Sequence, residues 1–303
     1  LPVALDGSCS GLQHYSAMLR DEIGGAATNL TYSYTMRDIY AEVAQATTDR
    51  LQAAEDDPEG FRQVWLAHGI NRQVTKRATM TTPYNVTKRG ATRYIIEDYL
   101  NKHELVPTRT QYRAASYIMD FIWPAIGDVV VKAREGMDYL DKAAREIVAQ
   151  SDTKSGTITW STPSGFLASQ SYYVPSEHRV PTLLYGHKRI KVLTESVKPS
   201  PQKHSLGLAP NFIHSMDASH MHLTITAVNE AIPGISLAMI HDSFGTHARY
   251  TQTMFDSVHV TFLTMYRDQD PLQDLANQYN LPEPPAKGNL DLTEVLDSLY
   301  AFA

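Results

Sequence analysis

The sequence predicts an α+β fold that is mainly helical, with a small sheet and a long helical insertion. Apolar residues recur at helical spacing through most of the chain, over residues 36–54, 63–82, 93–100, 112–150 and 211 to about 231. Short apolar strands are predicted near both ends, at residues 3–5 and 235–240, and each runs into an aspartate. Residues 155–193 are strand-like and include a predicted hairpin, and residues 198–204 are expected to form a loop.

The composition is that of a globular, soluble protein. With 303 residues, of which 43% are hydrophobic, the chain can bury one large core or two smaller ones. No apolar run approaches the length of a membrane span and no leader is visible at Leu1, so we expect no membrane partner. The first residue is not Met, which indicates a processed chain or a fragment. The single cysteine, Cys9, excludes an internal disulfide and fits a reducing compartment.

Charge is distributed unevenly along the chain. The formal net charge is -6, but residues 61–120 contain ten Lys or Arg against four acids and so carry +6, which leaves -12 for the rest. A basic segment on an acidic body is typical of a cleft for polyphosphate or nucleic acid. An ordinary solvated helix rich in arginine has the same charge, so charge alone leaves both interpretations open.

Asp6 follows the first strand and precedes a loop of small residues, GSCSG, after which a helix with an apolar stripe is predicted. An aspartate at a strand end beside such a loop is a common way to hold a hard cation such as Mg²⁺ near the oxygens of a substrate. The alternative is an aspartate that caps a helix or forms a turn, which is the commoner role. This segment alone does not decide between the two.

A second group of residues lies in the helix predicted over 63–82. Arg72, Lys76 and Met80 are four residues apart and share one face, and Tyr84 continues the series just past Pro83. An arginine fork and a mobile lysine ammonium suit a triphosphate, and the lysine can also protonate a leaving pyrophosphate. The alternative is a solvated basic stripe.

A second strand-end aspartate, Asp242, closes the strand predicted at 235–240. Two such aspartates, Asp6 and Asp242, are what a two-metal phosphoryl-transfer site requires.

Five segments of the chain together resemble motifs of the single-subunit DNA-directed RNA polymerases of bacteriophages and mitochondria, in the same order, with the phage members most similar. The segments are DGSCSGLQHYSAMLRDEIGG, RQVTKRATMTTPYN, APNFIHSMDASH, MIHDSFGT and PPAKGNLDLTEVLDSLYAFA. The resemblance implies the C-terminal palm-and-fingers portion of a right-hand polymerase, with a palm sheet and a helical fingers insertion. It assigns residues 1–22 to the palm, 23–213 to the fingers with a hairpin near 180–194, and 214–303 to the palm and a C-terminal tail.

The resemblance also implies the roles of individual residues. Asp6, Asp242 and the backbone carbonyl of Gly7 are expected to hold two Mg²⁺ ions, and Lys76 is expected to act as the general acid. The residues expected to bind the incoming nucleotide are Arg72 at the triphosphate, Tyr84 beside the base pair and ribose, His214 at the ribose 2′-hydroxyl, and Tyr40.

The implied activity is the addition of ribonucleotides to RNA 3′ ends by two-metal phosphoryl transfer. Related DNA polymerases place a glutamate five residues after the first metal aspartate, where its bulk excludes a 2′-hydroxyl. This chain has Gly11 there, which leaves room for ribose. The implied partners are a DNA template, nascent RNA, ribonucleoside triphosphates and an upstream polymerase portion. The expected location is the cytoplasm of an infected host cell, or the virion, rather than the mitochondrial matrix.

One residue departs from the family pattern, and two other hypotheses stay open. Asn85 stands where the family has a glycine after the tyrosine, and we expect it to adopt the left-handed conformation that Asn tolerates. The GSCSG loop also has the pattern of a nucleophile elbow, so a cysteine hydrolase that uses Cys9 with His241 or Asp242 is a rival hypothesis. A third hypothesis is a non-autonomous subunit of a split polymerase.

Overall fold

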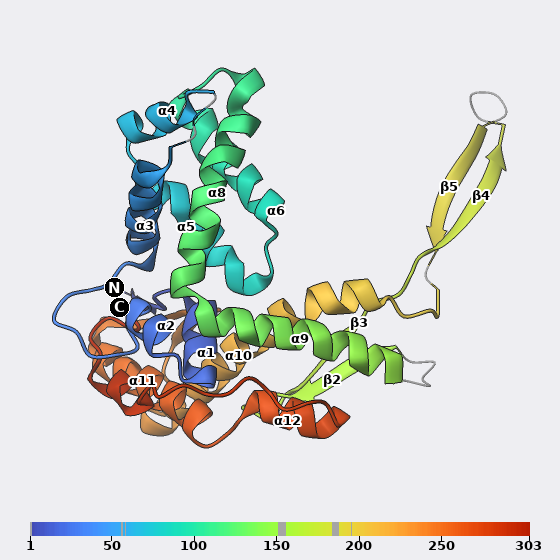
Figure 1. The fold of residues 1–303 in the computed structure, drawn as a ribbon. Helices are drawn as coiled ribbons and strands as arrows, with labels where there is room; N and C mark the ends of the chain where they lie inside the picture. Colours follow the sequence, from blue (N-terminus) through green and yellow to red (C-terminus); the bar gives the residue numbers. More distant parts are fainter. Residues whose placement is uncertain (1, 56, 58, 151–155, 184–187, 195) are drawn as a thin grey trace.

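The computed structural model describes the whole chain except residues 1, 56, 58, 151–155, 184–187 and 195. The described part is mainly helical with small sheets, as the sequence predicts (Figure 1). The α-helices are α1 Ser10–Leu19, α2 Glu22–Ala27, α3 Ile39–Ala53, α4 Phe61–His68, α5 Arg72–Thr81, α6 Lys88–Ile95, α7 Asn101–His103, α8 Gln111–Val129, α9 Val131–Gln150, α10 Pro201–Ala231, α11 Thr251–Arg267 and α12 Pro271–Tyr279. The strands are β1 Pro2–Asp6, β2 Thr157–Ser161, β3 Leu167–Ser171, β4 Ser176–Thr182, β5 Lys188–Thr194, β6 Leu237–Ile240 and β7 Ser243–His247.

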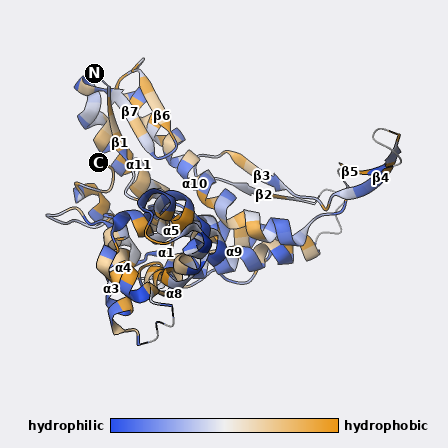
Figure 2. Ribbon diagram, turned by 90° about the horizontal axis from the view of Figure 1, so that it is seen from above, coloured by the Kyte–Doolittle hydropathy of each residue, from blue (hydrophilic) through white to orange (hydrophobic). Residues whose placement is uncertain are grey.

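A three-stranded antiparallel sheet brings the first and last parts of the chain together. Its strand order is β1-β7-β6, and Asp6 at the end of β1 pairs with Ser243 at the start of β7. The sequence predicts β1 and β6 but not β7. Figure 2 shows this sheet beside α10 and α11. Because Asp242 lies in the turn between β6 and β7, the pairing places it next to Asp6.

Two further strand pairs lie outside this sheet. Strands β2 and β3 pair with each other, as do β4 and β5, in which Val180 lies opposite Ile190. The β4–β5 pair projects away from the helices (Figure 1). The pair lies where the sequence predicts a hairpin near 180–194, and residues 184–187 between the two strands lie outside the described residues.

Two helices predicted as continuous are broken. The helix expected over 63–82 is divided into α4 and α5. Gly69, with φ 84°, ends α4. The Asn71 side chain then caps α5 by accepting a hydrogen bond from the backbone N–H of Gln73. The helix expected over 112–150 breaks at Val130, in a run of three β-branched valines that are poor helix formers. Helices α8 and α9 therefore meet at 95°. No single described helix has both the length and the apolar character to cross a membrane, although this bent pair passes that test by length and composition.

Helix α10 begins earlier than the sequence predicts. Most of the segment expected to be a loop, 198–204, forms the first turn of this helix. Ser200 caps the helix, and Pro201 occupies its first position, where the missing N–H of proline costs no hydrogen bond. The helix continues through Pro210, which cannot donate to the carbonyl of Leu206. The Asn85 side chain donates to that carbonyl instead, at 3.3 Å. Asn85 itself has φ 64°, so it takes the expected left-handed conformation.

Helix α1 lies at the centre of the core. All ten of its residues are buried, and it packs against α9, α10 and α2. Its largest fully buried side chain is Tyr15, with Leu19 one turn further on. Because α1 follows β1 after only three residues, its burial fixes the position of the loop that follows Asp6.

Candidate active site

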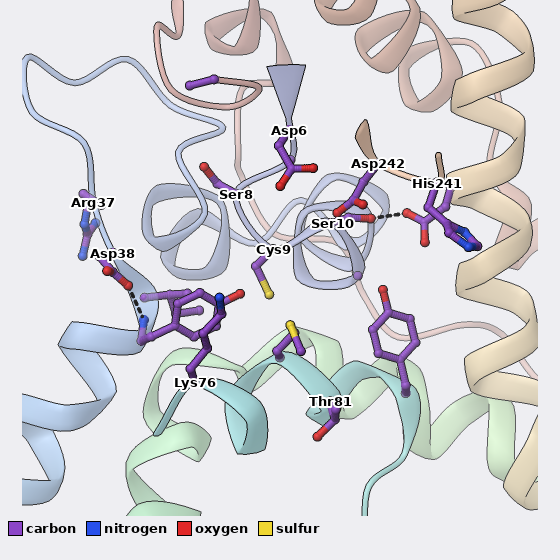
Figure 3. Close-up of a pocket in the computed structure, with 18 of the residues that line it drawn as sticks. Asp6, Ser8, Cys9, Ser10, Arg37, Asp38, Lys76, Thr81, His241 and Asp242 are labelled. Atoms are coloured by element: carbon purple, nitrogen blue, oxygen red, sulfur yellow. Dashed lines mark hydrogen bonds between the residues drawn. The ribbon is translucent and has the colours of Figure 1, made fainter. Parts of the chain in front are cut away.

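A pocket of about 480 Å³ lies where β1, the β6–β7 turn, α5 and α10 meet. Every residue for which the sequence predicts a catalytic, metal-binding or substrate-binding role lines it: Asp6, Gly7, Tyr40, Arg72, Lys76, Tyr84, His214 and Asp242. Figure 3 shows the carboxyl groups of Asp6 and Asp242 at one side of the pocket and Lys76 of α5 across from them. Sequence reasoning therefore identified residues that the fold brings together from five different segments.

The two aspartates are held close together by backbone pairing. Besides the pairing of Asp6 with Ser243, the N–H of Gly7 donates to the carbonyl of Asp242 at 3.1 Å. Burial, and next the charge of Asp6, raise the pKa of Asp242. Burial also raises the pKa of Asp6, and the Lys76 ammonium opposes that change. A cation bound between the two carboxylates would stabilise their charged forms, because it would offset both the cost of their burial and the repulsion of Asp242 by Asp6.

This donor set fits Mg²⁺. The described residues contain no group of three or more His, Cys, Asp or Glu side chains arranged to hold a metal. Two carboxylates and the carbonyl of Gly7 form an incomplete oxygen set, and Mg²⁺ is usually bound by one or two carboxylates with substrate phosphates and water as its other ligands.

Two cations line the opposite side of the pocket. The Arg72 guanidinium lies 5.0 Å from the ring centroid of Tyr40, and the Lys76 Nζ lies 6.0 Å from it. Arg72 also forms an ion pair with Asp38, whose carboxylate caps α3 as well. Lys76 forms no ion pair with any residue in the described part of the chain, so its ammonium is available to a ligand.

Tyr84 and His214 form a stacked pair at the end of the pocket formed by α1 and α10. Their ring centroids are 4.6 Å apart and the rings are inclined by 14°. A Cβ atom on Gly11 would lie 2.8 Å from the Tyr84 hydroxyl. The space that the sequence predicts Gly11 would leave for a ribose therefore contains the Tyr84 phenol in this structure.

Comparison with known proteins identifies the family of the chain. A family described as DNA-dependent RNA polymerase matches residues 1–281. The chain belongs to this family. Along its whole length it is 36% identical to T7 RNA polymerase of Escherichia phage T7, 35% identical to the DNA-directed RNA polymerase of Enterobacteria phage T3 and 32% identical to the mitochondrial DNA-directed RNA polymerase 1 of Arabidopsis thaliana. The resemblance to phage and mitochondrial single-subunit polymerases is confirmed, and among these relatives the phage enzymes share more identity with the chain.

The chain spans only part of each of these polymerases. It covers 40% of the two phage enzymes and 31% of the Arabidopsis thaliana enzyme. Membership in the RNA polymerase family is therefore shown for this chain, whereas the activity and partners of a whole polymerase are proposals for it.

Cys9 lines the pocket but has the properties of a packing residue. Only 7% of it is exposed, and burial raises the pKa of its thiol to about 11, with a hydrogen bond to Tyr40 opposing that change. A thiol with a raised pKa is a poor nucleophile. These observations weigh against the cysteine hydrolase.

Sequence reasoning missed a buried polar chain that begins in the wall of the pocket, where Ser10 and Asp217 lie. The Ser10 hydroxyl donates to the carboxylate of Asp217, as marked by the dashed line from Ser10 in Figure 3. His14 Nε2 lies 2.9 Å from Asp217 Oδ1, and His14 Nδ1 lies 2.6 Å from the hydroxyl of Tyr266. Burial alone would raise the pKa of Asp217, but His14 and Ser10 together lower it. The only sequence signal was that Asp217 follows His214 by three residues, which places both on one face of a helix.

Proposed function

We propose that this chain is the catalytic C-terminal part of a DNA-directed RNA polymerase that adds ribonucleotides to RNA 3′ ends by two-metal phosphoryl transfer. The observation that carries the proposal is the pocket itself, in which two aspartates face a lysine and an arginine and a tyrosine–histidine pair lies at one end. Each of these groups matches one part of a nucleoside triphosphate.

Asp6, Asp242 and the carbonyl of Gly7 hold two Mg²⁺ ions in this proposal. When bound, the ions activate the attacking 3′-hydroxyl and neutralise negative charge on the phosphates. The pKa values of both carboxyl groups are raised in the free protein, and the anions gain most from a bound cation in such a place.

Lys76 and Arg72 bind the triphosphate with different roles. Lys76 can neutralise the leaving pyrophosphate and donate a proton to it, whereas Arg72 stays protonated and acts only as a clamp. Tyr40 supports both cations through its ring face. Arg72 must exchange or share its partner Asp38 when the phosphates arrive.

Tyr84 and His214 read the sugar. Both carry polar groups at the wall of the pocket nearest Gly11, and a site built to hydrogen-bond a hydroxyl rejects an analogue that lacks it. We therefore assign ribose selectivity to this pair.

The right-hand layout belongs to the same proposal. Residues 1–22 and 214–303 form the palm and its tail, and residues 23–213 form the fingers, so that DNA template and nascent RNA lie between them. An upstream portion, like the one that the phage enzymes have, supplies the missing parts. Within the described residues, β1 pairs with β7 on one side, and on its other side Asp6 pairs with Ala303 through two backbone hydrogen bonds. The edge before Asp6 can still pair with an added strand. The proposed place of action is the cytoplasm of an infected cell.

The test is primer extension on a DNA template with the four ribonucleotides or deoxyribonucleotides, by the chain alone and together with an upstream portion. We expect template-directed RNA synthesis that requires both Mg²⁺ and the upstream portion. Absence of synthesis with both present would contradict the proposal, and synthesis by the chain alone would contradict the need for the upstream portion. Intact mass and co-purification from the natural source decide whether that portion is the same polypeptide or the second subunit of a split polymerase.

A further inference from the structure

Arg72 is the first residue of α5, so its position depends on how that end of the helix is held. The preceding residue, Asn71, caps the helix: its side-chain oxygen accepts a hydrogen bond of 2.9 Å from the backbone N–H of Gln73. The amide nitrogen of Asn71 then faces the other way and donates to the hydroxyl of Tyr99 at 2.9 Å. The first turn of α5 is thereby tied to a residue that lies 28 positions after its cap.

The Tyr99 hydroxyl has a second partner in His68, the last residue of α4. His68 Nε2 lies 2.6 Å from the phenol oxygen. An amide nitrogen only donates, so this oxygen accepts from Asn71, and the phenol proton is left for His68, its other partner in the described part of the chain. Burial raises the pKa of Tyr99, and the bond from Asn71 opposes that change, as expected when an amide donates to the phenol oxygen. The hydroxyl therefore donates once and accepts once, which fixes its orientation.

Tyr99 is itself held by close packing. It belongs to a π-helical turn, Ile96–Leu100, and only 2% of it is exposed. Its ring stacks on Trp65 of α4, with the two centroids 6.3 Å apart and the rings inclined by 27°. The indole N–H of Trp65 donates to the carbonyl of Ala114 in α8 at 3.1 Å. Because a side chain in a close-packed interior has little freedom to move, Tyr99 is a rigid partner for Asn71.

The ion pair of Arg72 with Asp38 is a weaker restraint than this buried contact. About half of the Arg72 side chain and a third of the Asp38 side chain are exposed, and exposed ion pairs contribute little to stability. In the proposed function, this pair is exchanged or shared when the phosphates arrive. The guanidinium is then positioned by the ring of Tyr40 and by the end of α5 that carries it.

We propose that Tyr99 and Asn71 are positioning residues for the triphosphate: Tyr99 anchors the first turn of α5 through Asn71, and this anchor keeps Arg72 where it meets the phosphates. The inference rests on the proposed role of Arg72 as the clamp of the triphosphate. Lys76 lies one turn further along α5, beyond the anchored turn. Loss of the anchor therefore weakens nucleotide binding and leaves the chemical step, in which Lys76 acts, nearly unchanged.

Tyr99→Phe tests the anchor, because it removes the hydroxyl and keeps the ring that stacks on Trp65. One measured quantity is the dissociation constant of ATP with Mg²⁺ on a primer–template with a 3′-deoxy primer end. The other is the saturated single-turnover rate on an extendable primer, and both are measured in the chain together with its upstream portion. We expect the dissociation constant to rise about three- to tenfold, the range of one neutral hydrogen bond, and the rate to stay within about twofold of the parent rate.

Two further variants separate the anchor from other effects of substitution. Asn71→Ser should raise the dissociation constant as Tyr99→Phe does, because serine caps a helix but is too short to reach the phenol. Tyr94→Phe in α6 is the matched control and should keep the parent dissociation constant. Within the described residues the Tyr94 hydroxyl has no hydrogen-bond partner, and the change keeps its ring against the guanidinium of Arg77.

A double-mutant cycle with Arg72→Ala shows whether the anchor acts through Arg72. In the Arg72→Ala background, Tyr99→Phe should not raise the dissociation constant further. An equal rise in both backgrounds, an equal rise for Tyr94→Phe, or a parent dissociation constant for Tyr99→Phe would overturn the inference and leave the proposed function intact. A parent enzyme that binds no ATP would overturn the proposed function as well.

Discussion

A Cβ atom on Gly11 would lie 2.8 Å from the hydroxyl oxygen of Tyr84, closer than side chains tolerate. The packing of Tyr84 therefore requires a glycine at position 11. This requirement is separate from the effect predicted from the sequence, in which Gly11 leaves room for the sugar. The tyrosine fills the space that a longer residue at this position would occupy. In the proposed function, selectivity for ribose then depends on the position of the Tyr84 phenol.

Gly11→Ala should displace Tyr84 and weaken discrimination between ribonucleotides and deoxyribonucleotides. The new methyl group meets a rigid ring and Pro83, so we expect a loss of about 1–3 kcal/mol in the free energy of unfolding, as for other overpacked sites. Urea unfolding and the ratio of the two incorporation efficiencies are the measurements. Gly127→Ala is the control, because its methyl group meets only the flexible end of Arg134. Parent values of both quantities for Gly11→Ala would refute this account of Gly11.

Lys76→Arg should preserve triphosphate binding and depress the chemical step, because arginine keeps the charge but cannot give up a proton. Loss of a general acid predicts a decrease of about 100-fold or more in the single-turnover rate. Arg72→Ala should instead weaken nucleotide affinity and leave the saturated rate closer to that of the parent. A Lys76→Arg enzyme with the parent rate would reject this division of roles.

Cys9 should react slowly with iodoacetamide. A pKa of about 11, against about 8.5 for a free thiol, lowers the thiolate fraction near neutral pH by at least about 100-fold. Mass spectrometry of timed samples gives the alkylation rate, and Cys9→Ser should retain nucleotide incorporation. Rapid alkylation together with loss of activity in Cys9→Ser would revive the cysteine hydrolase.

His220 should make the folded state less stable in acid. Burial among Phe244, Phe262 and Phe302 lowers the pKa of His220 to about 3, against 6.5 for an exposed histidine. Between pH 6.5 and pH 3, His220 binds a proton in the unfolded chain but not in the folded chain. The free energy of unfolding therefore falls as the pH falls. The decrease due to this residue is about 1.4 kcal/mol per pH unit below 6.5.

The measurement for His220 is urea unfolding of the parent and of His220→Phe at several pH values between 7.5 and 5. The variant loses the bond from the ring to the carbonyl of Val258 at every pH, but its stability should decline less steeply. Parallel pH profiles for the two proteins would show that His220 is not the cause.

The site residues that could be predicted are those that belong to local sequence patterns. Asp6 and Asp242 each end a short apolar run, and Arg72 and Lys76 are one helical turn apart, so strand ends and helical spacing were sufficient to find them. The contact between Ser10 and Asp217 was not predictable, because 207 residues separate the two and only the packing of α1 against α10 brings them together.

The fold shows the same division between local and distant determinants. Helix α10 continues through Pro210, and the carbonyl of Leu206 that the proline leaves free accepts a hydrogen bond from Asn85, which is far away in sequence. Strand β7 has a short sequence with a central glycine, Gly245, and its strand character comes from pairing on both sides with β1 and β6. Local propensity predicted neither feature, since each depends on a partner elsewhere in the chain.

The measurement that tests the central claim most directly is single-turnover nucleotide incorporation by Asp6→Asn and Asp242→Asn, with Asp256→Asn on the exposed face of α11 as the control. Each site variant keeps its shape and loses one ligand charge of the metal pair. We predict a rate decrease of at least about 1,000-fold, equivalent to about 4 kcal/mol of transition-state stabilisation, with nearly unchanged binding of the template–RNA duplex. Incorporation by either variant within about tenfold of the parent rate would contradict the assignment of these two aspartates as the metal ligands of an RNA polymerase.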